Sequence, residues 1–217
     1  MRFLITAGPT REPIDPVRYI SNRSAGTMCY AIAEAALETG HDVVLISGLV
    51  NLDTPRGAQF ISVLTSDEMD DAVHQHVRDC DVLVMCAAVA DYKPQDVSET
   101  KIKKRDAPLS LELIPTRDIL SSIKNKDRQF LVVGFAAETN DLEASARKKL
   151  QTKHCDIIVA NDVSGADSGM ESDQNEVTIF FRNGETKKIV CAPKKIIARE
   201  LVKIFSNTRE KSLTKKM

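Results

Sequence analysis

Short, uninterrupted apolar runs alternate with amphipathic stretches along most of this chain, and this alternation limits the folds open to it. The apolar runs fall at residues 2–7, 42–48, 59–64, 82–88, 130–136 and 156–160. Such runs are typical of strands buried on both faces of a parallel sheet. Helical spacing occurs at residues 25–39, 66–78, from about 118, and at 140–153, with Asn140 as a candidate cap. The order predicts an α/β fold with a Rossmann-like, mostly parallel sheet and helices on both faces.

One polar segment interrupts this pattern. Residues 91–108 are rich in lysine, poor in large apolar side chains, and follow directly on an apolar run. A long connection of this kind inside a compact domain is typical of a functional element. We expect an active-site flap that carries cations over a site at the end of the sheet.

The last third of the chain predicts a hairpin and a closing helix. Residues 175–191 contain two strand-like runs around Asn183-Gly184, a pair of residues that favours a tight hairpin turn. We expect a C-terminal β-hairpin that extends the sheet, followed by a helix over residues 193–206. The basic segment 207–217 is expected to be a frayed tail.

Composition and charge limit the function classes. The chain has 217 residues, of which 42% are hydrophobic and 28% charged, with a net charge of −1. These values suit a single domain, here residues 1–206, and give no general footprint for nucleic acid. No apolar run reaches the roughly 18 residues of a membrane span, and the first residues lack the layout of a signal peptide. We expect a cytoplasmic protein with no membrane partner.

The first strand leads into a loop suited to a charged ligand. Residues 3–7 are apolar and run into Gly8, and the polar loop that follows carries several arginines before a helix begins near residue 24. Ligands of open parallel sheets bind beyond the carboxyl ends of the strands, where a glycine and a helix N-terminus can approach a phosphate. The GxGxxG and GxxxxGK[ST] patterns are both absent, which disfavours a dinucleotide-dependent oxidoreductase and a P-loop enzyme.

Five segments together resemble phosphopantothenoylcysteine synthetase, the ligase of coenzyme A synthesis. They are AGPTREPIDPVRYISN at 7–22, CAAVADY at 86–92, KIKK at 101–104, VGFAAET at 133–139 and AND at 160–162. They occur in family order and cover nearly the whole chain. In many bacteria this domain is fused behind a flavin-dependent decarboxylase, whereas the present chain resembles the stand-alone form.

The resemblance implies a ligation in two steps. The carboxylate of 4′-phosphopantothenate attacks the α-phosphate of CTP, which gives an acyl-cytidylate and pyrophosphate. The amine of L-cysteine then attacks the acyl carbon and releases CMP. The resemblance also implies Mg²⁺ or Mn²⁺, without identifying its ligands, a homodimer, and a separate phosphopantothenoylcysteine decarboxylase as a candidate partner. Two alternatives stay open: the same ligation with ATP, and a non-catalytic nucleotide-binding subunit.

The resemblance assigns catalytic roles to Asn22 and Lys101. Asn22 is expected to contact the acyl intermediate and help convert it to product, since an amide both donates and accepts hydrogen bonds. Lys101 is expected to neutralise charge as the acyl-cytidylate forms. The residues alone allow a simpler interpretation, in which Asn22 stabilises a loop turn and Lys101 belongs to a solvated charged face.

The remaining expected contacts are assigned by the same resemblance. Arg18, Asn22 and Ala87 are expected to bind 4′-phosphopantothenate, although a surface ion pair of Arg18 with Asp15 or Glu12 is the alternative. The residues expected to bind CTP are Gly8, Cys86, Ala87, Ala88, Asp91, Lys101, Arg117, Asp118, Ile119, Leu120, Phe135, Lys149 and Lys153.

Four positions depart from the family pattern. Ala25 and Thr27 stand where the family usually has serine and lysine, and Cys29 stands where a glycine is common. Arg117 replaces a proline and adds a cation, which is expected to change nucleotide affinity.

Overall fold

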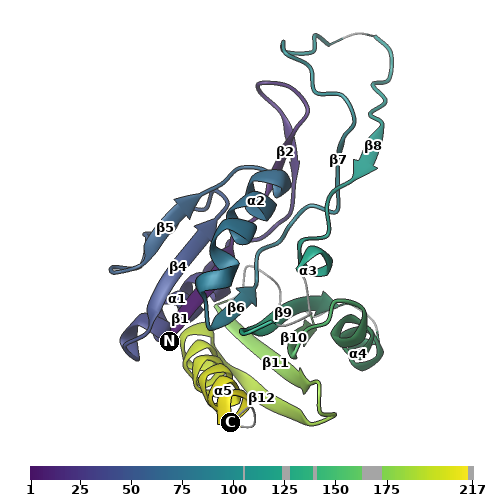
Figure 1. The fold of residues 1–217 in the computed structure, drawn as a ribbon. Coiled ribbons are helices and arrows are strands. Elements are labelled where there is room, and N and C mark those ends of the chain that lie inside the picture. Colours follow the sequence, from purple (N-terminus) through teal and green to yellow (C-terminus); the bar gives the residue numbers. More distant parts are fainter. Residues whose placement is uncertain (105, 124–127, 139–140, 163–172, 215–217) are drawn as a thin grey trace.

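The computed structural model is built around one eight-stranded sheet and describes residues 1–104, 106–123, 128–138, 141–162 and 173–214 (Figure 1). The strand order is β12-β11-β10-β9-β6-β1-β4-β5. In chain order the strands are β1 (Arg2–Ala7), β4 (Asp42–Ser47), β5 (Gln59–Ser62), β6 (Val82–Met85), β9 (Leu131–Glu138), β10 (Ile157–Asp162), β11 (Gln174–Phe181) and β12 (Thr186–Pro193). The six strands from β10 to β5 pair in parallel, while β11 and β12 form the expected antiparallel hairpin.

Helices cover both faces of the sheet, as the apolar runs predict. α1 (Thr27–Glu38) and α5 (Lys194–Thr214) pack on one face, and α2 (Ser66–His76) and α4 (Leu142–Thr152) pack on the other. Within β1, Phe3 and Ile5 belong to the core under α1 and α5, whereas Leu4 belongs to the opposite core. A strand that feeds two cores presents apolar side chains to both faces, which explains the continuous apolar run from Phe3 to Ile5.

The helix boundaries differ from expectation at two N-termini. α1 begins at Thr27 because Gly26, at the cap position, adopts a left-handed conformation with φ of 75°. α4 begins at Leu142, with Asp141 at the cap position, while Asn140 lies outside the described residues.

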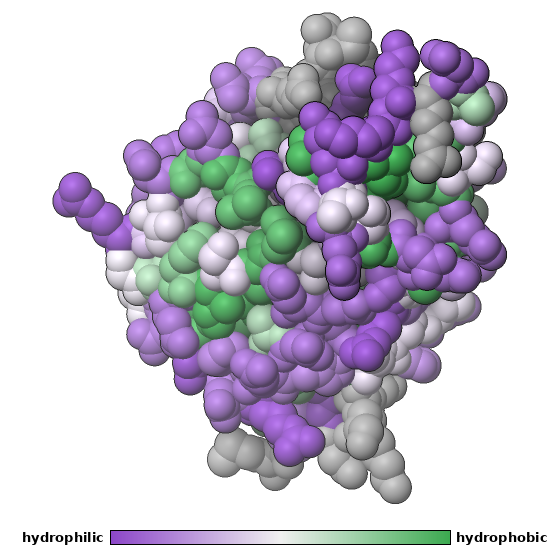
Figure 2. Space-filling model, turned by 90° about the horizontal axis from the view of Figure 1, so that it is seen from above, coloured by the Kyte–Doolittle hydropathy of each residue, from purple (hydrophilic) through white to green (hydrophobic). Residues whose placement is uncertain are grey.

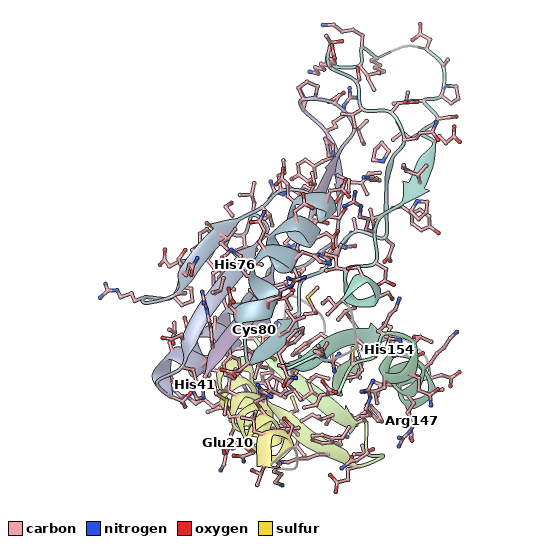
Figure 3. The ribbon with its side chains drawn as sticks, in the orientation of Figure 1. His41, His76, Cys80, Arg147, His154 and Glu210 are labelled. Atoms are coloured by element: carbon pink, nitrogen blue, oxygen red, sulfur yellow. The ribbon has the colours of Figure 1, made fainter. Side chains whose placement is uncertain are left out.

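The last helix corrects the prediction of a frayed tail. α5 continues to Thr214, so residues 207–214 are helical. The Arg209 side chain is 8% exposed and its Nη2 lies 3.3 Å from Asp81 Oδ1, a contact that holds this end of the helix against the body. Figure 3 shows His41 beside α5, where its Nε2 lies 3.1 Å from Ser206 Oγ.

Two antiparallel ribbons project from the carboxyl end of the sheet. The first pairs β2 (Arg11–Pro13) with β3 (Tyr19–Ser21), and the second pairs β7 (Tyr92–Pro94) with β8 (Leu113–Pro115). We call residues 92–115 the arm; it extends away from the sheet in Figure 1. The expected flap, residues 91–108, includes β7 and ends before β8, so the return strand was not predicted.

The arm exposes apolar side chains. Figure 2, which looks down on the arm end of the molecule, shows hydrophobic patches bordered by hydrophilic residues. Tyr92, Leu109 and Leu113 of the arm are 55%, 58% and 43% exposed. Among the described residues, no helix is long and apolar enough to cross a membrane.

Close packing behind the first loop makes Gly48 a sensitive position. A Cβ atom at Gly48 would lie 2.1 Å from the carbonyl oxygen of Pro9, and backbone atoms cannot move aside cheaply. We expect Gly48→Ala to lower the free energy of unfolding by about 3 kcal/mol or more, measured by urea denaturation. Gly40→Ala is the control: it has a φ of +79° but no atom within 4 Å. A loss of about 1 kcal/mol is expected there, and equal losses would contradict the packing argument.

Candidate functional site

The sheet places a cleft at its topological switch point. β1 lies between β6 and β4, and the chain passes from β1 through α1 to β4 on one side before α2 leads it to β6 on the other. Ligands of doubly wound sheets bind in the crevice outside the strand ends at this point. A cleft of about 690 Å³ lies here, lined by residues that follow β6, by the ends of β9 and β10, and by the N-terminus of α1.

Threonine side chains hold the floor of the cleft in place. Thr6 Oγ1 accepts hydrogen bonds from the backbone N–H groups of Cys86 and Ala87, each over 3.2 Å. Thr10 Oγ1 accepts from the N–H of Ala90 over 2.9 Å. The segment after β6 is therefore held by side chains of β1 and of the loop that follows it.

Asn22 is fixed against the same segment. Its Nδ2 donates to the carbonyl oxygens of Ala88 and Val89, over 3.1 and 3.2 Å. Both N–H groups of the amide have a partner in the backbone, so the amide oxygen is the group that Asn22 can offer to a ligand. The structure thus joins the loop that follows β1 to the segment that follows β6.

A second groove adjoins the cleft. It has a volume of about 660 Å³ and is lined by the β2–β3 ribbon, by residues 22–25 and by residues 49–52. Arg11 and Arg23 bring two cations to it, while Asn22 and Ser24 line both the groove and the cleft. Asn22 therefore lies where two ligand-sized spaces meet.

α3 (Ile119–Ser122) and α4 supply charged groups to one wall of the cleft. The Asp118 carboxylate caps α3 by accepting from Ser121 N–H over 3.0 Å, and it forms an ion pair with Lys153. Partial burial acts to raise the pKa of Asp118, but Lys153 and the Ser121 hydrogen bonds hold it below its ordinary value. Lys149 lies one turn before Lys153 on α4 and also lines the cleft.

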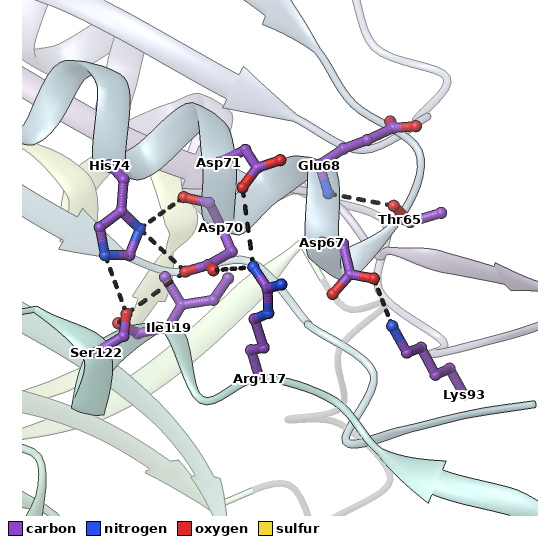
Figure 4. Close-up of polar contacts among 10 residues, drawn as sticks. All are labelled: Thr65, Asp67, Glu68, Asp70, Asp71, His74, Lys93, Arg117, Ile119 and Ser122. Atoms are coloured by element: carbon purple, nitrogen blue, oxygen red, sulfur yellow. Dashed lines mark hydrogen bonds and ion pairs between the residues drawn. The ribbon is translucent and has the colours of Figure 1, made fainter. Parts of the chain in front are cut away.

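Arg117 is held by α2 (Figure 4). Its Nη1 lies 3.4 Å from Asp70 Oδ2 and 4.0 Å from Asp71 Oδ1. Asp70 also contacts His74, whose Nε2 lies 3.3 Å from Ser122 Oγ. The cluster ties both ends of the segment 117–122 to one helix, and it neutralises part of the charge that Arg117 adds to the cleft.

Most of the predicted site residues meet in the cleft. Those that line it are Asn22, Cys86, Ala87, Ala88, Asp91, Arg117, Asp118, Ile119, Leu120, Phe135, Lys149 and Lys153.

Three predicted site residues lie outside the cleft. A Cβ atom at Gly8 would lie 2.9 Å from Gly48 O, so the tight turn itself requires glycine there. Arg18 forms the ion pair with Asp15 that was the alternative to ligand binding, with Nη2 to Oδ2 at 2.5 Å. Lys101 is exposed on the arm.

The Asp15 carboxylate anchors the arm to the β2–β3 ribbon. It accepts from the Ile102 N–H over 3.1 Å, and Arg18 Nη2 donates to the Ile102 carbonyl over 2.7 Å. Asp15 also accepts from the backbone N–H groups of Val17 and Arg18, each over 2.9 Å. The Arg18 side chain and these N–H groups outweigh burial and hold the pKa of Asp15 well below its usual range.

Asp15→Asn is expected to lower stability in a pH-dependent way. Because the folded-state pKa is lowered, the wild-type carboxylate stabilises the fold above its unfolded pKa of about 4, and this contribution is lost as pH falls towards the folded value. The midpoint of urea denaturation is expected to fall at pH 7, and the difference from wild type is expected to narrow at pH 3. A difference that is independent of pH would contradict the role of the charge.

The cleft also contains residues that the sequence analysis did not assign, and Lys194 is the clearest case. It begins α5, is 8% exposed, and its Nζ donates to Thr27 Oγ1 over 2.8 Å. Burial lowers the pKa of Lys194. Asn161 and Asn175 line the cleft as well. Of these three residues, Asn161 alone belongs to a segment that carries the family resemblance, the AND motif.

The described part of the chain contains no group of three or more histidine, cysteine, aspartate or glutamate side chains arranged to hold a metal ion. Figure 3 shows His41, His76 and His154 on separate parts of the fold.

Comparison with known proteins decides the family. Residues 1–208 match the family model described as DNA/pantothenate metabolism flavoprotein C-terminal domain. The chain belongs to this family. Members of the DNA/pantothenate metabolism flavoprotein family share the fold seen here: the crystal structure of the C-terminal domain of coenzyme A biosynthesis bifunctional protein CoaBC is 40% identical, with a TM-score of 0.83 over 97% of this chain and 96% of that one.

Two further comparisons were found, one with a curated protein and one with a solved structure. Coenzyme A biosynthesis bifunctional protein CoaBC of Bacillus subtilis is 47% identical over 200 residues, which are 92% of this chain and 49% of that protein. Cab2 in complex with phosphopantothenate-cysteine is 16% identical, with a TM-score of 0.80 over 99% of this chain and 88% of that one, and shows the fold alone.

The chain spans about half the length of the curated relatives it matches. These relatives are bifunctional proteins, so they do not support the expectation of a stand-alone form.

Proposed function

We propose that this chain is a phosphopantothenate–cysteine ligase domain that acts in coenzyme A synthesis through an acyl-cytidylate. The observation that carries the proposal is the position of Asn22 between the cleft and the arginine-containing groove. A ligase must bring a nucleotide and a carboxylic acid together at one point. The 40% identical relative is a domain of a coenzyme A biosynthesis protein, which supports this pathway.

In the first half-reaction the chain has to bring two anions together. The nucleotide occupies the cleft, where Lys149, Lys153 and Lys194 bring positive charge from α4 and α5. The phosphopantothenate occupies the groove, with its carboxylate directed towards Asn22. One carboxylate oxygen attacks the α-phosphorus, the bond to the bridging oxygen breaks, and pyrophosphate leaves. Positioning and charge stabilisation account for most of the catalysis in transfers of this kind.

In the second half-reaction Asn22 acts on the acyl-cytidylate. The cysteine amine attacks the acyl carbon, the acyl–phosphate bond breaks, and CMP leaves with the bonding electrons while the amine loses a proton. Because the Asn22 amide is held by Ala88 and Val89, its oxygen is preorganised to orient the incoming amine.

A divalent cation, Mg²⁺ or Mn²⁺, belongs to the proposal. Asp91 brings a carboxylate to the cleft, and Mg²⁺ is commonly held by one or two carboxylates together with substrate phosphates. Bound in this way, the cation would neutralise charge on the triphosphate. The donor set of the cleft therefore fits a metal that enters with the nucleotide.

A homodimer would allow the arm of one chain to reach the cleft of the other. Lys101 lies outside the cleft of its own chain, and the Ile102 contacts hold it against the β2–β3 ribbon. The arm exposes Tyr92, Leu109 and Leu113, which are the kind of apolar side chains that a protein interface buries. In the proposed dimer the arm delivers Lys101 to the cleft of the partner. A phosphopantothenoylcysteine decarboxylase is the proposed partner in the pathway.

Mass spectrometry tests the reaction. Purified protein is incubated with 4′-phosphopantothenate, Mg²⁺ and either CTP or ATP, with and without L-cysteine. An acyl-cytidylate without cysteine, converted on its addition to phosphopantothenoylcysteine and CMP, is the expected result. Turnover with ATP alone would overturn the nucleotide assignment. Nucleotide binding without pyrophosphate release would favour the non-catalytic subunit.

A further inference from the structure

Two thiols lie against each other in the wall of the cleft. Cys29 Sγ is 2.9 Å from Cys86 Sγ and 3.3 Å from the Cys86 carbonyl oxygen. Cys29 belongs to the first turn of α1 and Cys86 directly follows β6, so the pair bridges two elements that are 57 residues apart in sequence. Both residues line the cleft, and the proposed ligation uses neither thiol group.

The other cysteines have no hydrogen bond to a second thiol among the described residues. Cys80 and Cys155 are buried, and burial raises the pKa of each thiol to about 12. Cys191 is exposed on β12. The hydrogen bonds of the described residues join none of these three to another sulfur: Cys80 donates to Val77 O, Cys155 to Lys153 O, and Cys191 to Gln174 Oε1. Among the cysteines of the described residues, Cys29 and Cys86 are therefore the two whose sulfurs lie close enough to react with each other.

We propose that Cys29 and Cys86 form a reversible disulfide site, closed by a peroxide and reopened by a dithiol reductant. In the closing reaction one of the two sulfurs attacks one peroxide oxygen, the O–O bond breaks, and a sulfenic acid and one water are formed. The other sulfur then displaces the sulfenic oxygen, which leaves as a second water. Two thiols and one hydrogen peroxide thus yield one disulfide and two water molecules.

The geometry allows this bond with little movement. A disulfide requires an S–S separation near 2.05 Å, so the two sulfurs must approach by about 0.9 Å. Burial and the contact with Cys29 raise the pKa of Cys86, although Lys194 acts in the opposite direction. Closure is expected to accelerate as pH rises because the thiolate is the nucleophile.

Closure changes the cleft. Drawing Cys86 towards α1 displaces the segment that carries Ala87 and Ala88, both of which line the floor. We expect the oxidised protein to bind CTP on the order of tenfold more weakly, which is within the usual range for two coupled equilibria. By linkage, bound CTP is expected to shift the equilibrium between the disulfide and the two thiols towards the reduced form by the same factor.

Intact-mass spectrometry of the folded protein after hydrogen peroxide treatment tests the site. The expected result is a loss of about 2 Da, a linked Cys29–Cys86 peptide after alkylation of the remaining thiols, and full reversal by dithiothreitol. Cys29→Ser and Cys86→Ser are each expected to abolish the loss, whereas Cys191→Ser, the matched control, keeps it. Sulfinic acid without a disulfide, or a disulfide involving another cysteine, would overturn the proposal.

Phenylarsine oxide provides a second measurement that needs no oxidation. The reagent joins two neighbouring thiols through arsenic and releases one water. One arsenical per wild-type chain is expected, with none retained by either single-serine variant. Retention by both variants would place the dithiol elsewhere and contradict the assignment. These mass measurements do not depend on turnover, so they stand apart from the test of the proposed ligase.

Discussion

Asn22→Asp is expected to leave the protein able to form the acyl-cytidylate and nearly unable to convert it to phosphopantothenoylcysteine. The Asn22 amide donates to the carbonyl oxygens of Ala88 and Val89, and a carboxylate at this position has no hydrogen to donate. Its negative charge would face two carbonyl oxygens and the phosphate of the intermediate. Removing one positioned group of this kind costs roughly 100- to 1000-fold in rate, which is about 3–4 kcal/mol.

Single-turnover mass spectrometry measures this result, with the acyl-cytidylate and the product followed separately after cysteine is added. Asn207→Asp is the control, because it makes the same change at an exposed position on α5. Asn22→Ala separates the two roles of the side chain: it removes both hydrogen bonds without adding charge. If Asn22→Asp formed product at the wild-type rate, Asn22 would have no catalytic role despite its position between the cleft and the groove.

The sequence predicts the sheet and both of its faces well because that information is local. β1 and β4 are apolar at nearly every position, and only a strand buried on both sides requires this. The hairpin is also predicted from local information. Gly184 adopts a φ of +94°, a conformation that glycine tolerates and that Asn183-Gly184 therefore indicates without any contact from elsewhere in the chain.

Contacts between distant residues account for what the sequence did not predict. The end of α5 depends on Arg209 meeting Asp81, which lies 128 residues away. The basic character of residues 207–217 gives no sign of this contact. Lys194 reaches Thr27 across 167 residues, so no motif marks it as part of the cleft.

Arg18 forms the ion pair that the residues alone allowed, and its role in binding 4′-phosphopantothenate stays a prediction. An arginine in a loop near a ligand site suits a phosphate, yet here Asp15 lies three residues before it and accepts its side chain. The resulting pair holds Ile102 and sets the direction of the arm. The cleft motifs were easier to interpret, because residues that follow parallel strands gather at one edge of the sheet.

Lys101→Gln is expected to reduce acyl-cytidylate formation by on the order of 100-fold, because the positive charge that offsets the developing negative charge is removed. The affinity for CTP is expected to fall by a smaller factor than the rate of this step. Burst formation of pyrophosphate in a rapid-quench experiment measures the first step, and equilibrium dialysis measures binding. Lys103→Gln is the matched control, since it lies two residues away on the same exposed part of the arm. Equal losses in both variants would indicate a general charge effect.

A mixture of the Lys101→Gln and Asn22→Asp proteins shows which cleft the arm serves. Asp15 and Arg18 hold Ile102 to its own β2–β3 ribbon, and Lys101 is not among the residues that line its own cleft. If the arm reaches the partner, a mixed dimer has one complete site, and random exchange restores about a quarter of wild-type activity. If the arm serves its own chain, both sites of the mixed dimer stay defective. With one of the two variants labelled uniformly with ¹⁵N, native mass spectrometry separates the mixed dimer from both homodimers, so activity that is not restored in a fully exchanged sample would exclude the shared site.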